Sequence, residues 1–535
     1  MRLLKKRLSA EDGFTMLTTM MAVTLVTAVS AVAITAVSGD IHSNRNDLDH
    51  RRAFEAAKAG INDYVYHLHK ESSYWSRCTN VEEPSAVNQV GSTAKRRSVP
   101  GNTGGSYAIE LLPSTTQATY TECSTANPGP SMLESSGLLK GTFRIRSTGF
   151  SEKSKVSIVA TFKPATFLDY VYFTQRETSD PVTYGFANPS AALEGAYSQC
   201  SKTIAEGRYT SAMPNTGGQY CDTISFVEGD SINGPMHTND AFVICGKPTL
   251  GRNEFDSVEV SGPPKGWFQT KEVPHSGSSC SGGSNNFKGT FTASAPVITP
   301  PPTNGELASI AGLKFTGQVK ICLSGNSMTV GAGKTCNENV QYSGAIPASG
   351  VVYVSNGTCS TPYSPFTATY PATSGCGNAY IHGEYSGALT LATENDIIVD
   401  GNLIHSGEGV LGLVANNFVR IYHPFSSDET SKQTAHNVCN NGSNGPGSIT
   451  NLRIDAAILA INHSFIVDHY DCGAMLGTLT VNGAIAQKYR GAVGTTGNSG
   501  YLKNYTYDDR LRYIEPPSFI EPQQTDWVVG RETLE

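Results

Sequence analysis

Charged residues are scarce in this chain of 535 residues, and one stretch has none. Only 16% of the residues are Asp, Glu, Lys or Arg, and none of these occurs between Phe14 and Gly39. At about 1.5 Å of rise per residue, a helix there can cross a hydrocarbon core of about 30 Å. The sequence therefore predicts a transmembrane span over residues 14–38. The basic cluster Lys5-Lys6-Arg7 would stay on the cytoplasmic side, so the bulk of the chain is expected outside the cytoplasm.

Proline is missing from the first 83 residues, and the first proline of the chain is Pro84. No proline therefore forces a break in a helix before that position. Apolar residues recur at spacings of three and four from Phe54 to Leu68, and Asp47 and Arg51 are opposite charges at i, i+4. We expect one long helix over residues 14–75, apolar in its first half and amphipathic in its second.

The residues before this helix have a characteristic order. A basic leader over residues 1–13 ends in Gly13, and Phe14 opens the apolar run. In this the chain resembles type IV pilins and type II secretion pseudopilins. The resemblance implies that prepilin peptidase cuts after Gly13 and methylates the new amino group of Phe14. Major pilins have a glutamate where this chain has Thr18, and residues 52–60 instead resemble PilX-like minor pilins.

Two other interpretations of the same segment stay open. A secretory signal peptide could end at Ala36-Val37-Ser38, which offers small residues at the cleavage positions. The apolar run is longer than the usual core of a signal peptide, however. An uncleaved signal anchor is the second alternative.

Cysteine is absent from the apolar run and from everything before it, and no Cys-x-x-Cys occurs. This argues against zinc ribbons and thioredoxin-type redox chemistry. An even number of cysteines in an exported chain predicts disulfides between near neighbours, above all Cys322 with Cys336 and Cys359 with Cys376. The twelve candidates are Cys78, Cys123, Cys200, Cys221, Cys245, Cys280, Cys322, Cys336, Cys359, Cys376, Cys439 and Cys472.

Beyond the helix, the composition favours β structure. The chain has 54 glycines, and apolar residues alternate at Tyr107, Ile109 and Leu111, and again from Val156 to Phe162. Residues 76–165 are therefore predicted to form a small antiparallel sheet that packs on the amphipathic half of the helix. The pilin resemblance implies the same globular head.

A short repeat suggests the fold of residues 166–535. Its form is a β-branched residue, a polar residue and a glycine, as at Ile232-Asn233-Gly234, Ile381-His382-Gly383, Val399-Asp400-Gly401 and Val481-Asn482-Gly483. Gly383 and Gly401 are 18 residues apart, a length that fits one coil of a β-solenoid, and we expect each glycine to form the turn or bulge between short strands. The predicted fold class is α+β to mainly β, with a disulfide-rich parallel β-helix as the surface domain. A β-sandwich is the alternative.

Three segments interrupt or end this array. Residues 296–302 are rich in proline, which predicts an extended linker or an external strap. Residues 424–448 are expected to form a long loop stapled by Cys439. The aromatic tail from Tyr505 to Tyr513 is expected to cap the last coil.

Enzymatic chemistry is not expected. Candidate carboxylates are Glu384, Asp400, Asp455, Asp468 and Asp471, with Arg453 or Arg490 as basic partners, and His405, His463 and His469 are candidate metal ligands. No spacing typical of a metal site or a nucleophile connects them, so turns, ion pairs and core packing account for them better. No cofactor or metal is therefore expected. The modest net charge of −7 argues against nucleic acid as a partner.

The expected function is that of a minor or tip subunit of a type IV pilus or a related filament, structural and either adhesive or assembly-priming. The expected partners are prepilin peptidase, other pilin or pseudopilin subunits, the membrane before assembly, and a surface glycan or a host or substratum ligand. The expected location is the cytoplasmic membrane, then the cell surface or pilus. The alternative is a secreted or membrane-anchored β-helix that acts on or binds polysaccharide.

Overall fold

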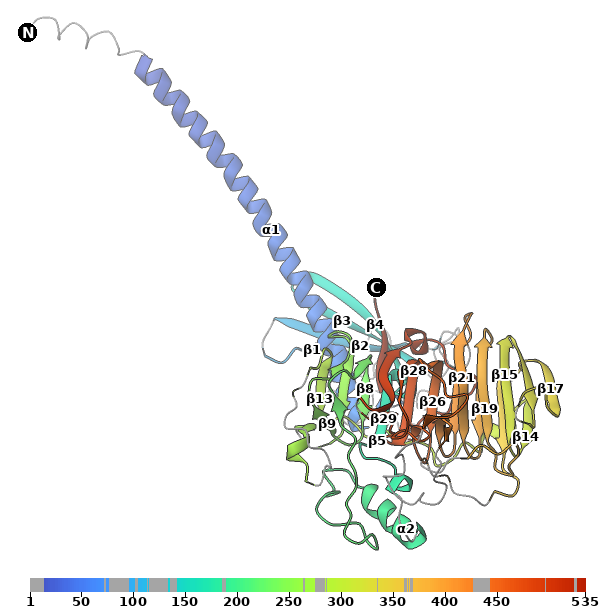
Figure 1. The fold of residues 1–535 in the computed structure, drawn as a ribbon. Helices are drawn as coiled ribbons and strands as arrows, with labels where there is room; N and C mark the ends of the chain where they lie inside the picture. Colours follow the sequence, from blue (N-terminus) through green and yellow to red (C-terminus); the bar gives the residue numbers. More distant parts are fainter. Residues whose placement is uncertain are drawn as a thin grey trace, which may run out of the picture. The chain divides into compact units, whose positions relative to one another are not determined.

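The protein is described by a computed structural model and is mainly β with few helices (Figure 1). It divides into two compact units, unit 1 (Met1–Pro164 and Trp527–Glu535) and unit 2 (Ala165–Asp526). The last residues of the chain thus belong to unit 1, whereas we expected a surface domain over 166–535. The described residues are 14–71, 74–76, 96–101, 104–112, 114, 133–134, 142–184, 189–262, 265–274, 284, 286–333, 335–359, 363, 365, 369–426, 443–495, 497–523 and 527–535.

Unit 1 begins with the predicted long helix, α1 (Phe14–Lys70), which is one unbroken α-helix followed by the short 3-10 turn η1 (Tyr74–Ser76). Within the part of the chain that is described, no helix is long and apolar enough to cross a membrane. The predicted span over residues 14–38 is therefore not found. Of that span, the structure describes the side chains of residues 16–32.

The second half of α1 packs on an antiparallel sheet. The sheet has the order β1-β2-β3-β4-β31, with β1 (Arg97–Ser98), β2 (Gly105–Leu112), β3 (Phe143–Ser151), β4 (Ser154–Pro164) and β31 (Trp527–Leu534). Ile61 and Tyr64 of α1 share a core with Ile109, Phe143 and Phe162 of the sheet, all of them at most 1% exposed. The predicted alternation of apolar residues is confirmed here, because one face of the sheet is buried on the helix.

Unit 2 consists of short strands with few helices. Its strands are β5 (Tyr172–Arg176), β6 (Phe226–Val227), β7 (Ser231–Asn233), β8 (Met236–Thr238), β9 (Phe242–Cys245), β10 (Thr249–Leu250), β11 (Ser257–Val260), β12 (Trp267–Gln269), β13 (Thr290–Ala293), β14 (Leu313–Thr316), β15 (Val319–Gly325), β16 (Ser327–Gly331), β17 (Val340–Ala345), β18 (Val351–Ser355), β19 (Ala379–Tyr385), β20 (Leu389–Thr393), β21 (Ile397–His405), β22 (Leu411–Ala415), β23 (Val419–Ile421), β24 (Phe425–Ser426), β25 (Ser443–Asn444), β26 (Arg453–Ala460), β27 (Phe465–Val467), β28 (Met475–Tyr489), β29 (Gly494–Thr495) and β30 (Ser499–Tyr507). Its helices are α2 (Pro189–Cys200), α3 (Leu307–Ile310) and the 3-10 turns η5 (Phe167–Asp169), η6 (Pro181–Tyr184), η7 (Thr270–Glu272) and η8 (Asp509–Arg512).

Most of these strands pair in parallel and form long ladders. One ladder runs β14-β18-β20-β22-β26-β28-β5-β8-β11-β13. A second runs β15-β19-β21-β26-β28-β30-β7-β10 (Figure 1). A β-sandwich is built from antiparallel sheets, so these ladders do not favour that alternative.

The order of the strands in space differs from their order in the chain. β5 lies near the start of unit 2, yet it pairs with β28 on one side and β8 on the other. β30 likewise pairs with both β28 and β7. The prediction that the tail from Tyr505 caps the array is therefore wrong, because Tyr505 lies in an internal strand.

The proline-rich segment connects two distant parts of the ladders. Ile298 exchanges two hydrogen bonds with the side chain of Asn239, directly after β8. A few residues later, the Asn304 side chain donates hydrogen bonds to the carbonyl oxygens of Thr393 and Val414, at 2.8 and 2.9 Å. Because β5, β28 and β26 lie between β8 and β22, residues 296–304 act as a strap across them.

Three of the four repeat glycines, Gly383, Gly401 and Gly483, lie inside strands, whereas Gly234 lies between β7 and β8 as expected. Ile381 pairs with Val399, so the two repeats that are 18 residues apart are in parallel register. A Cβ atom on Gly383 would lie 2.2 Å from the carbonyl oxygen of Leu323, in the neighbouring strand. These three glycines therefore do not separate strands, although the register between β19 and β21 does shift between Ile381 and Gly383. At Gly383 the lack of a side chain allows close approach of two backbones.

Among the described residues, three disulfides join cysteines that are neighbours in the sequence: Cys200–Cys221, Cys322–Cys336 and Cys359–Cys376. The last two confirm the pairs that we predicted. Cys245 and Cys472 are also disulfide-bonded. The other cysteines, Cys78, Cys123, Cys280 and Cys439, lie outside the described residues, as does most of the loop predicted over 424–448.

Candidate assembly surface and charged clusters

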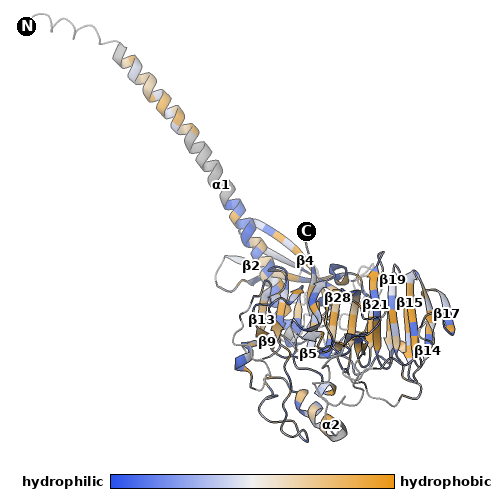
Figure 2. Cartoon of the chain, viewed as in Figure 1, coloured by the Kyte–Doolittle hydropathy of each residue, from blue (hydrophilic) through white to orange (hydrophobic). Residues whose placement is uncertain are grey.

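The first half of α1 exposes an apolar surface. Its large hydrophobic side chains are 59% to 68% exposed. At about 3.6 residues per turn, their positions fall on all sides of the helix. Figure 2 colours the chain by hydropathy and includes hydrophobic positions in this part of α1. They are Met16, Leu17, Met20, Met21, Val23, Leu25, Val26, Val29 and Val32. A helix that is apolar all round is normally buried in protein or lipid. We call this set the apolar surface of α1.

The threonines within this segment do not prevent its burial. The hydroxyls of Thr19, Thr24 and Thr27 donate hydrogen bonds to backbone carbonyls three or four residues earlier, at 2.9 to 3.0 Å. A hydroxyl that is satisfied by its own helix adds little cost when water is removed. The apolar surface of α1 can therefore be covered without leaving these donors unpaired.

The predicted processing site is only partly visible. Gly13 lies outside the described residues, and Phe14 is the first residue of α1.

In unit 2, Asp400 is paired with two bases. It lies in β21, where Lys320 Nζ donates to one carboxylate oxygen and His382 Nδ1 to the other, both at 2.7 Å. Burial raises the pKa of Asp400, but these hydrogen bonds outweigh it and hold that pKa below its ordinary value. Glu384, in β19, is exposed and is not part of this pairing.

Asp455 forms a second, separate group. Its buried carboxylate accepts hydrogen bonds from His405 Nδ1 at 2.9 Å and from Arg453 Nε at 2.8 Å. Both oxygens of Asp455 are therefore occupied, and an acid or base for catalysis would need a free one.

Asp468 belongs to a third group. The hydroxyls of Tyr363 and Tyr370 donate to its two oxygens, and Arg420 lies 3.7 Å away. His469 Nδ1 bonds the carbonyl of His423 at 2.8 Å, and burial lowers the pKa of His469. Asp471 is half-buried in the turn before Cys472. The sequence-predicted carboxylates are thus distributed over separate clusters.

Further ion pairs in unit 2 were not predicted from the sequence. Arg490 Nη1 bonds the buried Glu177 at 3.1 Å, although 313 residues separate the two. Burial raises the pKa of Glu177, while Arg490 opposes that effect. Arg208 pairs with Asp240, and both side chains are fully buried. No local spacing connects these residues, so only the ladder register could reveal them.

His463 is held in a fourth cluster. Its Nδ1 lies 2.9 Å from the buried Asp180, and its ring stacks on Phe418. Among the described residues, no group of three or more His, Cys, Asp or Glu side chains could hold a metal ion. Each of these clusters joins residues from different segments of unit 2.

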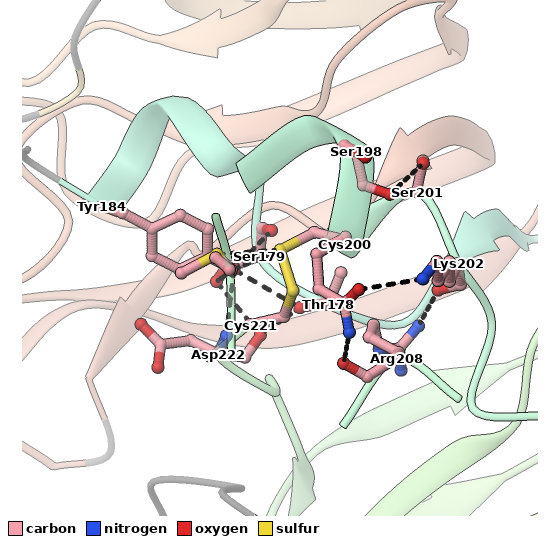
Figure 3. The surroundings of a disulfide bond; sticks show 12 residues. Thr178, Ser179, Tyr184, Ser198, Cys200, Ser201, Lys202, Arg208, Cys221 and Asp222 are labelled. Atoms are coloured by element: carbon pink, nitrogen blue, oxygen red, sulfur yellow. Dashed lines mark hydrogen bonds between the residues drawn. A yellow bond between two sulfur atoms is a disulfide. The ribbon is translucent and has the colours of Figure 1, made fainter. Parts of the chain in front are cut away.

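The disulfide Cys200–Cys221 lies in a hydroxyl-rich environment (Figure 3). The Tyr184 hydroxyl lies 3.9 Å from Cys200 Sγ, and it accepts a hydrogen bond from the backbone of Asp222 at 3.0 Å. Met213 Sδ lies 3.5 Å from Cys200 Sγ. This disulfide anchors the end of α2.

Comparisons with known proteins found little. No family model matches the chain, and no curated protein matches it. Among solved structures, the chain is similar to the competence-associated pilin ComZ from Thermus thermophilus, with a TM-score of 0.31 and 11% identity. That match covers 91% of this chain and 98% of the other.

Proposed function

We propose that this chain is a minor or tip pilin-like subunit of a type IV pilus or a related filament. The observation that carries the proposal is the apolar surface of α1, which is exposed while the second half of the same helix is buried on its sheet. Other pilin or pseudopilin helices are its partners in the filament. Before assembly the precursor is held in the cytoplasmic membrane, cut after Gly13 by prepilin peptidase and methylated on Phe14.

The energetics support such a role for α1. Burying one large aliphatic side chain is worth about 1.5 to 3 kcal/mol, so the whole apolar surface of α1 represents on the order of 10 kcal/mol or more. A helix bundle in a filament core would recover that free energy. An isolated monomer in water would not, and it would associate through this segment.

Unit 2 suits display at the cell surface. We infer from its stacked parallel ladders and its neighbour disulfides that it is a β-solenoid. A head of this size on every subunit would crowd a filament, which supports a minor or tip position. Its role would be adhesion to a surface glycan or to a host or substratum ligand, or priming of assembly.

A non-enzymatic role is part of the proposal. Asp400, Asp455 and Asp468 each have their oxygens occupied by different partners. A polysaccharide-active enzyme needs two carboxyl groups that flank one bond. The pairing of these carboxylates supports binding or structure over turnover.

A pair of charge substitutions tests the proposal. Leu25 is 68% exposed on α1, and Leu502 is 48% exposed in unit 2. We expect Leu25→Glu to leave both units folded but to remove the protein from sheared filaments. Leu502→Glu should be incorporated like the unaltered chain. Equal recovery of both variants in filaments would overturn the proposal.

A further inference from the structure

One of the three described disulfides lies against a histidine and a carboxylate. Cys322 Sγ is 3.3 Å from His382 Nε2, and His382 Nδ1 is 2.7 Å from Asp400 Oδ1. Cys322, His382 and Asp400 belong to three neighbouring strands, β15, β19 and β21. A cysteine sulfur, a base and a carboxylate that orients the base thus follow one another, an arrangement that activates cysteine in many enzymes.

The backbone explains how these residues meet. Cys322 is directly opposite His382 in the parallel register of β15 and β19. The register between β19 and β21 shifts between Ile381 and Gly383, at His382. A Cβ atom on Gly401 would lie 2.8 Å from the Cβ of His382, so the glycine of this repeat leaves the space that the imidazole needs.

The arrangement favours the reduced form of this disulfide. The Asp400 carboxylate, which Lys320 also contacts, accepts from Nδ1 of His382 and so holds the imidazole with Nε2 toward Cys322 Sγ. An imidazolium beside sulfur stabilises a thiolate, and a disulfide whose reduced form is stabilised is reduced more easily. Among the described residues, no histidine hydrogen-bonds a sulfur of Cys200–Cys221 or Cys359–Cys376.

We propose that Cys322, His382 and Asp400 form a thiol–disulfide exchange site. Its substrates are thiols in one direction and disulfides in the other. The proposal is independent of the filament role, because it concerns only unit 2.

The reduction takes two steps and consumes two equivalents of a thiol. A thiolate attacks Cys322 Sγ, which is part-exposed, the bond to the buried Cys336 breaks, and Cys336 leaves as a thiolate that takes up a proton. A second thiolate attacks the outer sulfur of the mixed disulfide. The bond between this outer sulfur and Cys322 Sγ breaks, and its electron pair goes to Cys322 Sγ. His382 Nε2–H donates a hydrogen bond to the new thiolate. The thiols leave as one oxidised dimer, and the reverse steps reoxidise the site.

The experiment uses the whole exported chain and reduced glutathione as the thiol. Differential alkylation and peptide mass spectrometry measure the reduction rate of each disulfide in the same molecule. We expect Cys322–Cys336 to be reduced about tenfold faster than Cys359–Cys376, and His382→Gln to abolish that difference. Asp400 is a positioning residue, so Asp400→Asn should reduce the difference only in part.

Two further measurements separate this role from a structural one. In the reduced protein, the alkylation rate of Cys322 should stay high at pH values below the usual thiol pKa. In the His382→Gln variant, the rate should fall at these pH values. The titrating groups that face His382 are Cys322 and Asp400, with Lys320 behind Asp400. A His382→Lys variant restores a cation and should recover part of the rate. Equal reduction rates for the three disulfides, or a difference that survives His382→Gln, would overturn the proposal.

Discussion

Unit 1 leaves much of its apolar surface uncovered, whereas unit 2 covers nearly all of its own. Among the described residues, eighteen large hydrophobic side chains are exposed, of which twelve are in unit 1 and eleven of those on α1. Only six are in unit 2, although it is the larger unit. Size therefore does not explain the difference. The exposed apolar side chains are concentrated on α1 of unit 1, and unit 2 buries most of its own.

The two units also differ in what completes them. Unit 1 gains its last strand, β31, from the end of the chain. Unit 2 is completed by the pairing of its first strand, β5, with β28 and by the strap over residues 296–304. Substitutions at each of these places should affect one unit and spare the other.

The largest effect is expected where α1 lies on the sheet of unit 1. A Cβ atom on Gly149 would be 1.9 Å from the carbonyl oxygen of Ala53 in α1. We expect Gly149→Ala to destabilise unit 1 by about 3 kcal/mol, because helix and strand must move apart. The stability of unit 2 in urea, followed by hydrogen exchange of its backbone amides, should be the same as in the unaltered chain. Gly530→Ala is the matched control, since its Cβ would meet only Lys163 carbons at 3.4 Å.

The strap of unit 2 should show the next largest effect. Asn304→Ala removes two buried hydrogen bonds, to the carbonyls of Thr393 and Val414, although the Thr393 carbonyl keeps the hydrogen bond from the Asn416 backbone N–H. The expected loss of unfolding free energy is about 2 kcal/mol and is confined to unit 2. Glu306→Ala, on the exposed side of the same segment, should change nothing measurable. A uniform loss in both units would contradict the strap.

Acid should weaken unit 2 through Glu259. Burial raises the pKa of Glu259, but hydrogen bonds from His237, Ser257 and Tyr170 outweigh it and lower that pKa below 4.5. A lowered folded pKa stabilises the fold above the unfolded value, and this stability is lost as pH falls through the folded pKa. The Glu259→Gln variant should therefore have a lower free energy of unfolding than the unaltered chain at neutral pH. This difference should become smaller well below pH 4.5. A gap that is independent of pH would count against this linkage.

The smallest effect is expected in the core of unit 1. The Tyr64 hydroxyl is buried and has no hydrogen-bond partner among the described residues. Tyr64→Phe keeps the ring contacts with Tyr74 and Phe162 and should leave unit 1 as stable or up to about 1 kcal/mol more stable. Tyr64→Ala is the contrast, with an expected cost of about 3 to 5 kcal/mol. A marked loss on Tyr64→Phe would reveal a partner for the hydroxyl.

Local patterns made part of this fold predictable. The spacing of apolar residues predicted α1 and its buried face, and alternation predicted β2 and β4. The short separation of the cysteines in the sequence predicted the disulfides Cys322–Cys336 and Cys359–Cys376. In each case the information lies within a short stretch of chain, where helix and strand periods or small loop closures decide the structure.

What the sequence could not predict depends on the register between distant segments. Nothing in Trp527–Leu534 indicates that it pairs with β4, and nothing in Tyr172–Arg176 indicates its place between β28 and β8. The pair of Glu177 and Arg490 follows from that placement. Alternation gives a strand its buried face but does not select its neighbour. The role of Gly383 and Gly483 was misjudged for the same reason, because the backbone that each one approaches lies in another strand.

The position of unit 2 in the chain has a mechanical consequence. Unit 2 is inserted between β4 and β31, and Trp527 at the start of β31 is paired with Pro164 at the end of β4. Both connections to unit 2 therefore leave from the same end of two adjacent strands. A tensile load on unit 2 is divided between two covalent connections, and it pulls β4 and β31 in the same direction. The hydrogen bonds between these strands are not peeled apart one at a time, so the junction resists traction better than a single connecting strand would.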